Sequence, residues 1–298
     1  MSTKGVIVSR VIGGLGNQMF QYAVGRALSL ARGQSLRLDV SGFANYGLHQ
    51  GFELQRVFDC PAEIATEAEV RSILGWQFSP SIRRVVVRPG LAVIRREGFV
   101  VEPHFHYWPE IKNVPQVCYL NGYWQTEKYF RDVASVIRAD FTFKTPLANR
   151  NAELAEQIGQ VSAVSLHVRR NDYAKNPQTN AAHGLCSLDY YRVAIKQVYE
   201  RVEQPYFFIF SDDIAWVKGN LRMALPCEYI DRNQGAESYN DMRLMSLCRH
   251  HIIANSTFSW LGAWLNPSPE KIVVAPKKWF ANDTNITVDL FPQGWEIV

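Results

Sequence analysis

The chain alternates between short runs of β-branched and aromatic residues and longer segments whose apolar residues recur at helical spacing. The run at residues 6–12 predicts a strand, the pattern over 17–32 a helix, and the run at 35–40 a second strand. Gly33 follows the helical pattern, where glycine commonly ends a helix. A strand, a helix and a strand in this order imply two parallel strands joined by a crossover helix.

The alternation becomes regular after residue 145 and predicts a second parallel sheet flanked by helices. The predicted strands cover 161–168, 206–211, 227–231, 250–254 and 271–275. The predicted helices cover 147–158, 188–203, 214–221, 238–249 and 257–265. Ser238 and Asp241 have the spacing of a capping box at the start of the fourth of these helices. Two sheets predict two domains, which we place at 1–150 and 151–280.

The part between these regular regions predicts a helix over 66–75, a strand over 117–123 and a helix over 127–138. The stretch 82–96 is basic and rich in β-branched residues. Six arginines gather in this part: Arg71, Arg83, Arg84, Arg88, Arg95 and Arg96. They favour a solvated face, with contact to an acceptor or a membrane surface as the alternative. The tail, 281–298, shows no strong period, and we expect it to pack back on the first domain.

Composition narrows the class of protein. The 298 residues exceed what one hydrophobic core usually needs, and the net charge of +4 is small for a nucleic-acid-binding surface but suits an anionic small molecule. Five cysteines without paired spacing argue against a disulfide framework. No run approaches the roughly 20 apolar residues of a membrane span, and no signal segment is recognisable before the first strand. We therefore expect a cytoplasmic protein, with peripheral membrane contact left open.

A glycine-rich loop follows the first strand: Gly13-Gly14-Leu15-Gly16-Asn17-Gln18. Such glycines let a ligand approach the backbone at the start of a helix. Met19 stands where a dinucleotide-binding fingerprint needs its third glycine, although Asp39 has about the spacing of the ribose-binding acid. We favour a tight turn that positions Asn17 and Gln18; a nicotinamide site, as in an oxidoreductase, and a turn without a ligand are the alternatives.

Two adjacent arginines, Arg169 and Arg170, stand directly after the strand predicted at 161–168. Arginine is seldom buried without a partner, and its planar guanidinium matches phosphate oxygens. Ligands of open α/β sheets bind at the carboxyl ends of strands. Breaking a nucleotide-sugar bond leaves a charged diphosphate, which a metal or fixed cations must stabilise. Because no Asp-x-Asp metal pair stands on a suitable loop, the arginines are predicted to replace the metal; a surface ion-pair cluster is the alternative.

Two further strand ends carry polar residues. In Ser211-Asp212-Asp213 a carboxylate can accept two hydrogen bonds from a guanine edge, or it can cap the next helix. The small polar residues of Asn255-Ser256-Thr257 can cap a helix and also bind phosphate at its N-terminus. The histidines show no metal-ligand spacing with a carboxylate, so no metal site is predicted.

Four segments, 13–23, 121–125, 167–173 and 255–264, resemble in order the bacterial α-1,2-fucosyltransferases of glycosyltransferase family 11. The third contains His-x-Arg-Arg-x-Asp, a motif also found in α-1,6- and protein-O-fucosyltransferases. The resemblance implies an α/β fold of the GT-B type, two Rossmann-like domains facing across a cleft. It also implies GDP-β-L-fucose as donor, the 2-hydroxyl of a β-galactose as acceptor, and an inverting reaction without a metal.

The same resemblance assigns site residues. Those expected to bind the donor are His167, Arg169, Arg170, Asp213, Ser256, Thr257 and Phe258. Arg169 would hold the β-phosphate, with Arg170 in support. Asn17 and Gln18 would face the acceptor or the fucose. Asp172 is the first candidate for the catalytic base, with orientation of the arginines as its alternative role; the loop after it carries no glutamate, unlike the α-1,6 relatives.

We therefore predict a galactoside 2-α-L-fucosyltransferase that acts on galactose-terminated glycans, such as intermediates of surface polysaccharides, without a cofactor. A fucosyltransferase of another linkage, such as α-1,6, is one alternative. A non-catalytic nucleotide-sugar or glycan-binding module is the other, and it would bind the donor without releasing GDP in the presence of an acceptor.

Overall fold

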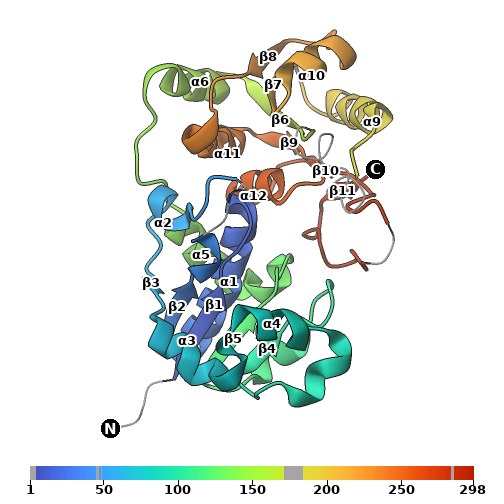
Figure 1. The fold of residues 1–298 in the computed structure, drawn as a ribbon. Helices are drawn as coiled ribbons and strands as arrows, with labels where there is room; N and C mark the ends of the chain where they lie inside the picture. Colours follow the sequence, from blue (N-terminus) through green and yellow to red (C-terminus); the bar gives the residue numbers. More distant parts are fainter. Residues whose placement is uncertain (1–4, 45–46, 48, 171–183, 283–284) are drawn as a thin grey trace. The chain divides into compact units, whose positions relative to one another are not determined.

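A computed structural model describes residues 5–44, 47, 49–170, 184–282 and 285–298. The chain forms two compact units (Figure 1). Unit 1 contains the chain up to Lys144 together with Ile286–Leu290, and unit 2 contains Thr145–Asn285 together with Phe291–Val298. The border therefore lies six residues before the position expected from the sequence, in the loop that precedes the first helix of unit 2.

Unit 1 is built on a five-stranded parallel sheet with the order β3-β2-β1-β5-β4. Its strands are β1 (Val6–Arg10), β2 (Ser35–Asp39), β3 (Glu63–Ile64), β4 (Phe99–Val101) and β5 (Cys118–Asn121). Its α-helices are α1 (Leu15–Arg32), α2 (Leu54–Val57), α3 (Glu67–Leu74), α4 (Pro80–Val86) and α5 (Ala134–Asp140). Its 3-10 helices are η1 (Ser41–Phe43), η2 (Gly75–Phe78), η3 (Pro89–Ile94), η4 (Pro109–Asn113), η5 (Glu127–Tyr129) and η6 (Arg131–Val133).

The opening β1-α1-β2 unit confirms the predicted parallel pair. Gly33 ends α1 in the left-handed conformation, with φ of 61°, and its N–H donates to the carbonyl of Leu30. A side chain at this φ is strained, so the sequence signal and the helix end have the same cause. Residues 18–25 of α1 are all buried, so the helix is covered on more than the face turned to the sheet; Phe20 packs on Phe130 and Tyr22 on Phe141.

Two parts of unit 1 are irregular: one for which the sequence predicted no particular element, and one where a predicted helix is broken. The β-branched stretch 82–96 forms the end of α4 and the whole of η3, because Pro80 favours a helix start and Val86 is buried in the core behind α4. The helix predicted over 127–138 is broken into η5, η6 and α5. Phe130, buried and with a non-helical φ of −139°, separates the first two pieces.

Unit 2 is built on a six-stranded sheet with the order β11-β10-β9-β6-β7-β8, again with parallel pairing throughout. Its strands are β6 (Ser162–Val168), β7 (Pro205–Ser211), β8 (Cys227–Ile230), β9 (His250–Ile252), β10 (Val273–Ala275) and β11 (Glu296–Ile297). Its helices are α6 (Asn149–Gln160), α9 (Leu188–Tyr199), α10 (Ile214–Asn220), α11 (Tyr239–Leu247), α12 (Thr257–Leu265) and the short η7 (Gly235–Glu237). All strands and helices predicted here after residue 145 are present, and β11 is an addition.

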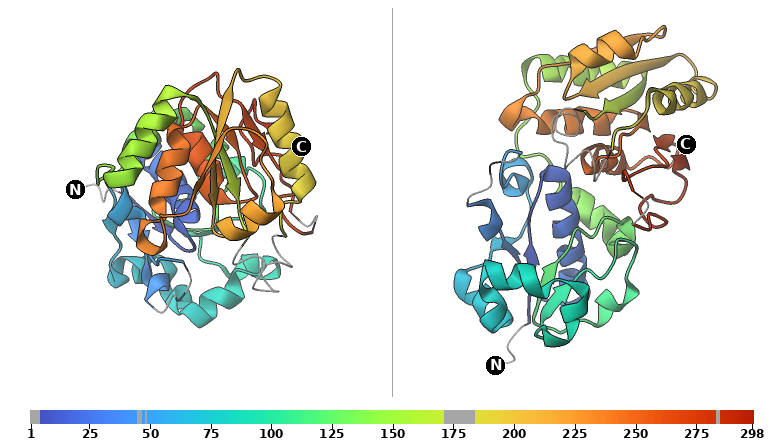
Figure 2. Two further views of the ribbon diagram at one scale, coloured as in Figure 1. Left: turned by 90° about the horizontal axis from the view of Figure 1, so that it is seen from above. Right: turned by 45° about the vertical axis from the view of Figure 1, so that its right-hand side comes forward.

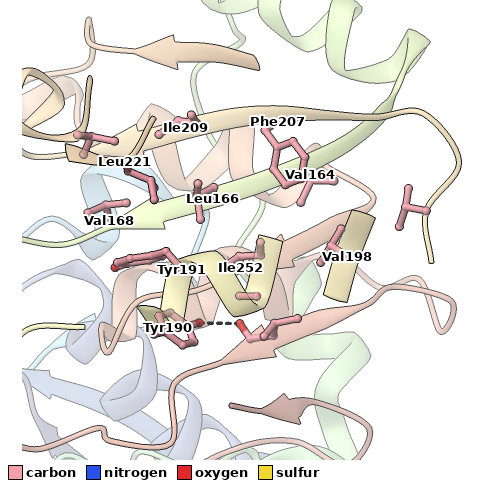
Figure 3. Packing of buried hydrophobic residues seen from close by; sticks show 14 residues of the cluster. Val164, Leu166, Val168, Tyr190, Tyr191, Val198, Phe207, Ile209, Leu221 and Ile252 are labelled. Carbon is pink, nitrogen blue, oxygen red and sulfur yellow. Dashed lines mark hydrogen bonds between the residues drawn. The ribbon is translucent and has the colours of Figure 1, made fainter. Parts of the chain in front are cut away.

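Helices cover both faces of this sheet (Figure 2). On β7, Phe207 and Ile209 join one buried apolar cluster, whereas Phe208 and Phe210 join another. Successive side chains of a strand point to opposite faces, so these two clusters lie on opposite sides of the sheet. Figure 3 shows the first cluster, in which Tyr190 of α9 also donates a hydrogen bond to the carbonyl of Val274, 3.1 Å away. Burial on both faces explains why these strands are continuous apolar runs in the sequence.

The capping box expected at Ser238 is absent. Ser238 is already helical, with φ of −59° and ψ of −24°, and its side chain makes no capping hydrogen bond. The reason is that η7 runs almost directly into α11, so the chain is turning before the α-helix begins. Asp241 instead accepts a hydrogen bond from Asn233 at 2.7 Å, and burial raises the pKa of its carboxyl to about 7.

The tail divides between the two units. Residues 286–290 belong to unit 1, where Asp289 accepts hydrogen bonds from the N–H of Tyr107 and from the ammonium of Lys128. Residues 291–298 belong to unit 2, where β11 adds a parallel strand beside β10. The tail is thus a structural part of both units rather than an appendage.

Candidate functional site

The donor-site residues predicted in unit 2 meet at the carboxyl edge of its sheet. β6 and β7 pair in parallel with Val168 opposite Ser211, so the residues that follow each strand are neighbours. β9 pairs with β6 on the other side and leads into the N-terminus of α12. The predicted residues 167, 169, 170, 213 and 256–258 therefore stand at three adjacent strand ends. This is the edge where open α/β sheets bind ligands.

Asp212 connects the two arginines. Its Oδ1 accepts the backbone N–H of Arg170 at 2.8 Å, and its Oδ2 lies 3.2 Å from Nε of Arg169. Because the contact is made to Nε, where the guanidinium group joins the rest of the side chain, it fixes the orientation of the guanidinium plane of Arg169. The side chains of Arg169 and Asp212 are 24% and 20% exposed, so the pair lies at the surface of the unit rather than deep in its core.

The neighbouring Asp213 has a different position. It is the N-cap of α10, and its carboxylate accepts the N–H of Trp216 at 3.1 Å. Of the two interpretations open for this pair of aspartates, helix capping thus holds for Asp213, while Asp212 holds the arginines. The expected contact of Asp213 with a nucleoside stays a prediction.

Arg170 stacks on an aromatic ring that the sequence analysis missed. Its guanidinium carbon lies 3.6 Å from the centroid of the Trp216 ring, a short cation–π contact. Its Nε is buried and has no hydrogen-bond partner among the described residues. A buried donor without a protein partner is uncommon in folded proteins, and a ligand oxygen is one partner that would satisfy it.

His167 is the last but one residue of β6, two positions before Arg169, and is only 4% exposed. Burial, together with the charge of Arg169, lowers the pKa of its imidazole to about 3. The ring is therefore neutral near pH 7, and its centroid lies 6.0 Å from that of Phe258. Nδ1 of His167 is buried and also has no hydrogen-bond partner within the described part of the chain. Nδ1 of His167 and Nε of Arg170 are thus two buried nitrogens at this sheet edge that have no hydrogen-bond partner among the described residues.

The third strand end supplies the N-terminus of α12. Ser256 caps this helix by accepting the N–H of Phe258 at 3.3 Å, and it is 8% exposed. The buried amide of Asn255 donates to the carbonyls of Gly184 and Trp279, which ties the loop in place. Thr257 and Phe258 are half-buried, so they are the residues of this turn that can contact a ligand.

The glycine loop of unit 1 corrects one prediction. Gln18 was expected to face a sugar, but its side chain is fully buried. Its Nε2 donates to the carbonyls of Gly13 and Gly51, and its Oε1 accepts the N–H groups of Glu53 and Leu54. These four contacts use both N–H donors and both acceptor positions of the side-chain amide. Gln18 therefore holds the loop rather than a ligand. Asn17 is half-buried, and its Oδ1 accepts a hydrogen bond from Gln125 at 2.9 Å.

Asp39 does not have the surroundings of a ribose-binding acid. It is 4% exposed and accepts hydrogen bonds from the N–H of Ser41 and the hydroxyl of Tyr119. Burial acts to raise its pKa, but these hydrogen bonds and the nearby Arg83 outweigh burial and hold the pKa below its usual range. Asp39 is thus an internal anchor, and together with Met19 in place of a third glycine it argues against the nicotinamide alternative.

Glu102 is a carboxyl group that the sequence analysis missed. It follows β4 at the same sheet edge as the glycine loop, and it accepts the N–H groups of Tyr123 at 2.6 Å and Trp124 at 3.0 Å. Burial nevertheless raises its pKa to about 7. A Cβ on Gly122 would come within 2.4 Å of the Glu102 side chain, so the glycine permits this contact. The only sequence signal was the position of Glu102 directly after a short apolar run.

Among the described residues, no group of three or more His, Cys, Asp or Glu side chains is arranged to hold a metal ion. Asp172, the first candidate for the base, lies outside these residues. Within the same part of the chain, no helix has the length and apolar character needed to cross a membrane.

The sequence is similar to known glycosyltransferases. A model of glycosyl transferase family 11 matches residues 108–298. The alpha-1,2-colitosyltransferase of Escherichia coli is 36% identical over 97% of this chain and 98% of its own length. The O-antigen biosynthesis glycosyltransferase WbnK of Escherichia coli is 35% identical over 93% of this chain and 96% of its own. The galactoside 2-alpha-L-fucosyltransferase SEC1 of Bos taurus is 23% identical over 88% of this chain and 64% of its own.

Solved structures show the same architecture. The NodZ alpha-1,6-fucosyltransferase soaked with GDP-fucose matches with a TM-score of 0.54 at 17% identity, covering 89% of this chain and 94% of NodZ. A variant of Arabidopsis thaliana FUT1 in complex with GDP matches with a TM-score of 0.54 at 14% identity, covering 98% of this chain and 76% of that protein. Two parallel-sheet α/β units with these neighbours identify the fold as the GT-B type, as expected from the sequence.

Proposed function

Since this chain belongs to glycosyl transferase family 11, we propose that it transfers L-fucose from GDP-β-L-fucose to the 2-hydroxyl of a terminal β-galactose. The linkage formed would be α-1,2, and the acceptor a galactose-terminated glycan of a surface polysaccharide. Relatives named as α-1,2-colitosyl- and 2-α-fucosyltransferases support the linkage. Solved neighbours with GDP-fucose or GDP bound support the nucleotide part of the donor.

The observation that carries the proposal is the positioned arginine pair, together with two buried nitrogens, one of Arg170 and one of His167, that have no hydrogen-bond partner among the described residues. Asp212 orients Arg169, and Trp216 holds Arg170, so both cations are positioned before a donor binds. Nδ1 of His167 and Nε of Arg170 are buried without partners among the described residues, which suits oxygen atoms of a bound nucleotide. Preorganised cations of this kind stabilise negative charge that develops in a transition state.

The proposed reaction is a single displacement. The galactose 2-hydroxyl oxygen attacks C1 of fucose while the bond from C1 to the β-phosphate oxygen breaks, and the electron pair of that bond leaves with GDP. Attack from the opposite face converts the β-donor into the α-product. Arg169 and Arg170 would neutralise the leaving diphosphate, so we propose that the reaction does not need a divalent metal.

A base must accept the proton of the attacking hydroxyl. Asp172 is one candidate, on the grounds of its place in the motif. Glu102 is a second, because a carboxyl with a pKa of about 7 at the sheet edge of unit 1 can take up a proton near neutral pH. The two candidates are distinguished by which substitution, Glu102→Gln or Asp172→Asn, changes the pH dependence of kcat/KM.

Colitose is the second candidate for the transferred sugar. The E. coli relative named as an alpha-1,2-colitosyltransferase is 36% identical over nearly the whole chain. Colitose lacks the 3-hydroxyl of fucose but shares its 6-deoxy-L-hexose frame, so both donors present the same diphosphate to the arginine pair. The choice between them then depends on contacts with one hydroxyl group.

One experiment tests linkage and donor together. The protein is incubated with GDP-fucose, GDP-colitose or GDP-mannose and a panel of β-galactosides, and the products are analysed by NMR. We expect an α-1,2-linked product with GDP-fucose and none with GDP-mannose. A product from GDP-colitose alone would establish the second candidate. Donor binding without GDP release in the presence of every acceptor would instead favour a binding module.

A further inference from the structure

We propose that a basic and apolar surface of unit 1 docks the protein on a bilayer that contains anionic lipid. This surface, called here the arginine–valine patch, is formed by the exposed side chains of residues 76–96 on η2, α4 and η3. Its apolar members are 54%, 45%, 90% and 46% exposed: Trp76, Val85, Val93 and Ile94. Its basic members are the exposed Arg84, Arg88 and Arg96. The proposal does not depend on which sugar is transferred.

The patch is held together by hydrogen bonds between its elements. Gln77 of η2 donates to the carbonyl of Ile94 at 2.7 Å and accepts the N–H of Arg96 at 3.1 Å. Arg95 donates through Nε to the carbonyl of Val86 at 2.7 Å and through a terminal nitrogen to the carbonyls of the next two residues. These contacts fix η3 against both η2 and α4, so the exposed side chains are displayed on a preformed surface.

The same segment has a separate set of apolar residues that pack into the core of unit 1, so the exposed apolar residues are not needed there. Val86 is buried with Phe99 and Tyr119 in the core of unit 1, and Ile82 and Val87 pack on that cluster. Helix α4 therefore already has an apolar face turned to the sheet. Val85 and Val93 lie outside that cluster, and Val93 at 90% exposure is the most accessible large apolar side chain among the described residues.

Charge identifies the kind of partner. Residues 76–96 contain five arginines, Arg83, Arg84, Arg88, Arg95 and Arg96, and no Asp or Glu, which gives +5 against +4 for the whole chain. Arg83 is paired with Asp39, whereas no carboxylate of the described residues is paired with Arg84 or Arg88. A second copy of the same patch would be repelled. Nucleic acid would match the arginines but not the exposed Val93 and Ile94.

An anionic bilayer satisfies both features. Basic side chains are attracted to anionic headgroups, while protruding apolar and tryptophan side chains insert at the boundary between headgroups and acyl chains. The patch also leaves the sheet edge of the proposed chemistry uncovered. Ile94 leads towards the amino end of β4, which begins at Phe99, whereas Glu102 follows its carboxyl end. Figure 2 shows α4 and the teal segment after it on the periphery of unit 1.

The test is co-sedimentation of the full chain with vesicles of phosphatidylcholine alone or of equal parts phosphatidylcholine and phosphatidylglycerol. We expect binding to the anionic vesicles only, weakening with added salt because screening shortens the reach of the arginines. Arg84→Glu combined with Arg88→Glu should lower the partition coefficient at least about 25-fold, taking about fivefold for each basic residue neutralised. Val93→Asp combined with Ile94→Asp should lower it about tenfold or more.

Matched controls lie in unit 2. Val193→Asp changes an apolar residue of α9 that is 47% exposed, and Arg222→Glu reverses an exposed arginine, so both should keep wild-type binding. Every variant should also keep its far-UV circular dichroism and its activity on a short water-soluble galactoside. Equal binding to neutral vesicles, loss of binding in the controls, or a wild-type dimer that Val93→Asp dissociates would each overturn the proposal.

Discussion

Asp212→Asn is the sharpest test of how the arginine pair is positioned. The carboxylate accepts two donors, the N–H of Arg170 at 2.8 Å and Nε of Arg169 at 3.2 Å. Asparagine offers one acceptor and one donor in the same space. If its oxygen keeps the backbone contact, its amide nitrogen faces Nε, and donor then meets donor. The variant thus removes the orientation of Arg169 without removing either arginine.

The size of the effect follows from burial. A hydrogen bond to a charged group contributes about 1.5–3 kcal/mol when buried. With side-chain exposures of 24% and 20%, the contact is partly screened, and we take the lower end, about 1.5 kcal/mol. If that energy holds Arg169 in the conformation that binds the donor, GDP should bind roughly tenfold more weakly. Turnover should fall by at least the same factor, since in the proposed reaction the same cation binds the leaving group.

Isothermal titration calorimetry with GDP measures the first effect and steady-state kinetics the second. Asp189→Asn is the matched control, because Asp189 forms an exposed ion pair with Arg192 on α9. Arg169→Lys is the companion variant, since it keeps the charge but loses Nε. Wild-type GDP affinity in both Asp212→Asn and Arg169→Lys would refute the idea that orientation through Nε matters.

Four further results are expected. Arg169→Ala should lower kcat by roughly a hundredfold or more, as for the loss of one preorganised donor, and near-normal turnover would remove its role on the leaving group. Gln18→Leu should lower the free energy of unfolding by about 2–4 kcal/mol in urea titrations, because four backbone groups, two of them buried and two partly buried, lose a partner; an unchanged value would show that they find others. If Glu102 is the base, kcat/KM should rise as pH passes through about 7, and Glu102→Gln should abolish that limb, whereas a limb that survives Glu102→Gln and is lost in Asp172→Asn would identify Asp172. Activity should survive EDTA, and a loss restored by Mn²⁺ would contradict metal independence.

The raised pKa of Glu102 also predicts how the stability of the folded protein depends on pH. Folding raises its pKa from 4.5 to about 7. Between these two pH values the carboxyl is protonated in the folded state but has already lost its proton in the unfolded state. The stabilisation from this proton is complete below the ordinary glutamate pKa and is lost as pH rises through about 7. Glu102→Gln should therefore flatten the fall in melting temperature over this interval.

The sequence predicted the architecture well because both sheets are parallel and covered by helices. Strands buried on both faces become continuous apolar runs, and helices between them keep a distinct period, so elements such as β7 and α9 were recognisable. The clustering of Arg169 with residues after β7 and β9 was predictable for a related reason. Parallel strands bring their carboxyl ends to one edge, whatever their distance along the chain.

Side-chain roles were harder to predict where the deciding partner comes from another element. Gln18 looks like a ligand-facing amide beside glycines, but its acceptor is used by backbone groups at positions 53 and 54. Trp216 follows a helix cap, and only the fold brings it under Arg170. β11 contains two residues in a segment without a period, so only its pairing with β10 defines it as a strand.

The division of the tail between the two units has a practical consequence for protein engineering. The chain passes from one unit to the other at three places, after Lys144, after Asn285 and after Leu290. A chimera joined only at residue 144 would exchange Asp289 and β11 along with the second half, separating Lys128 from its carboxylate. Recombination between relatives should therefore graft 286–290 with the N-terminal fragment, or choose parents whose residues at this short return are interchangeable.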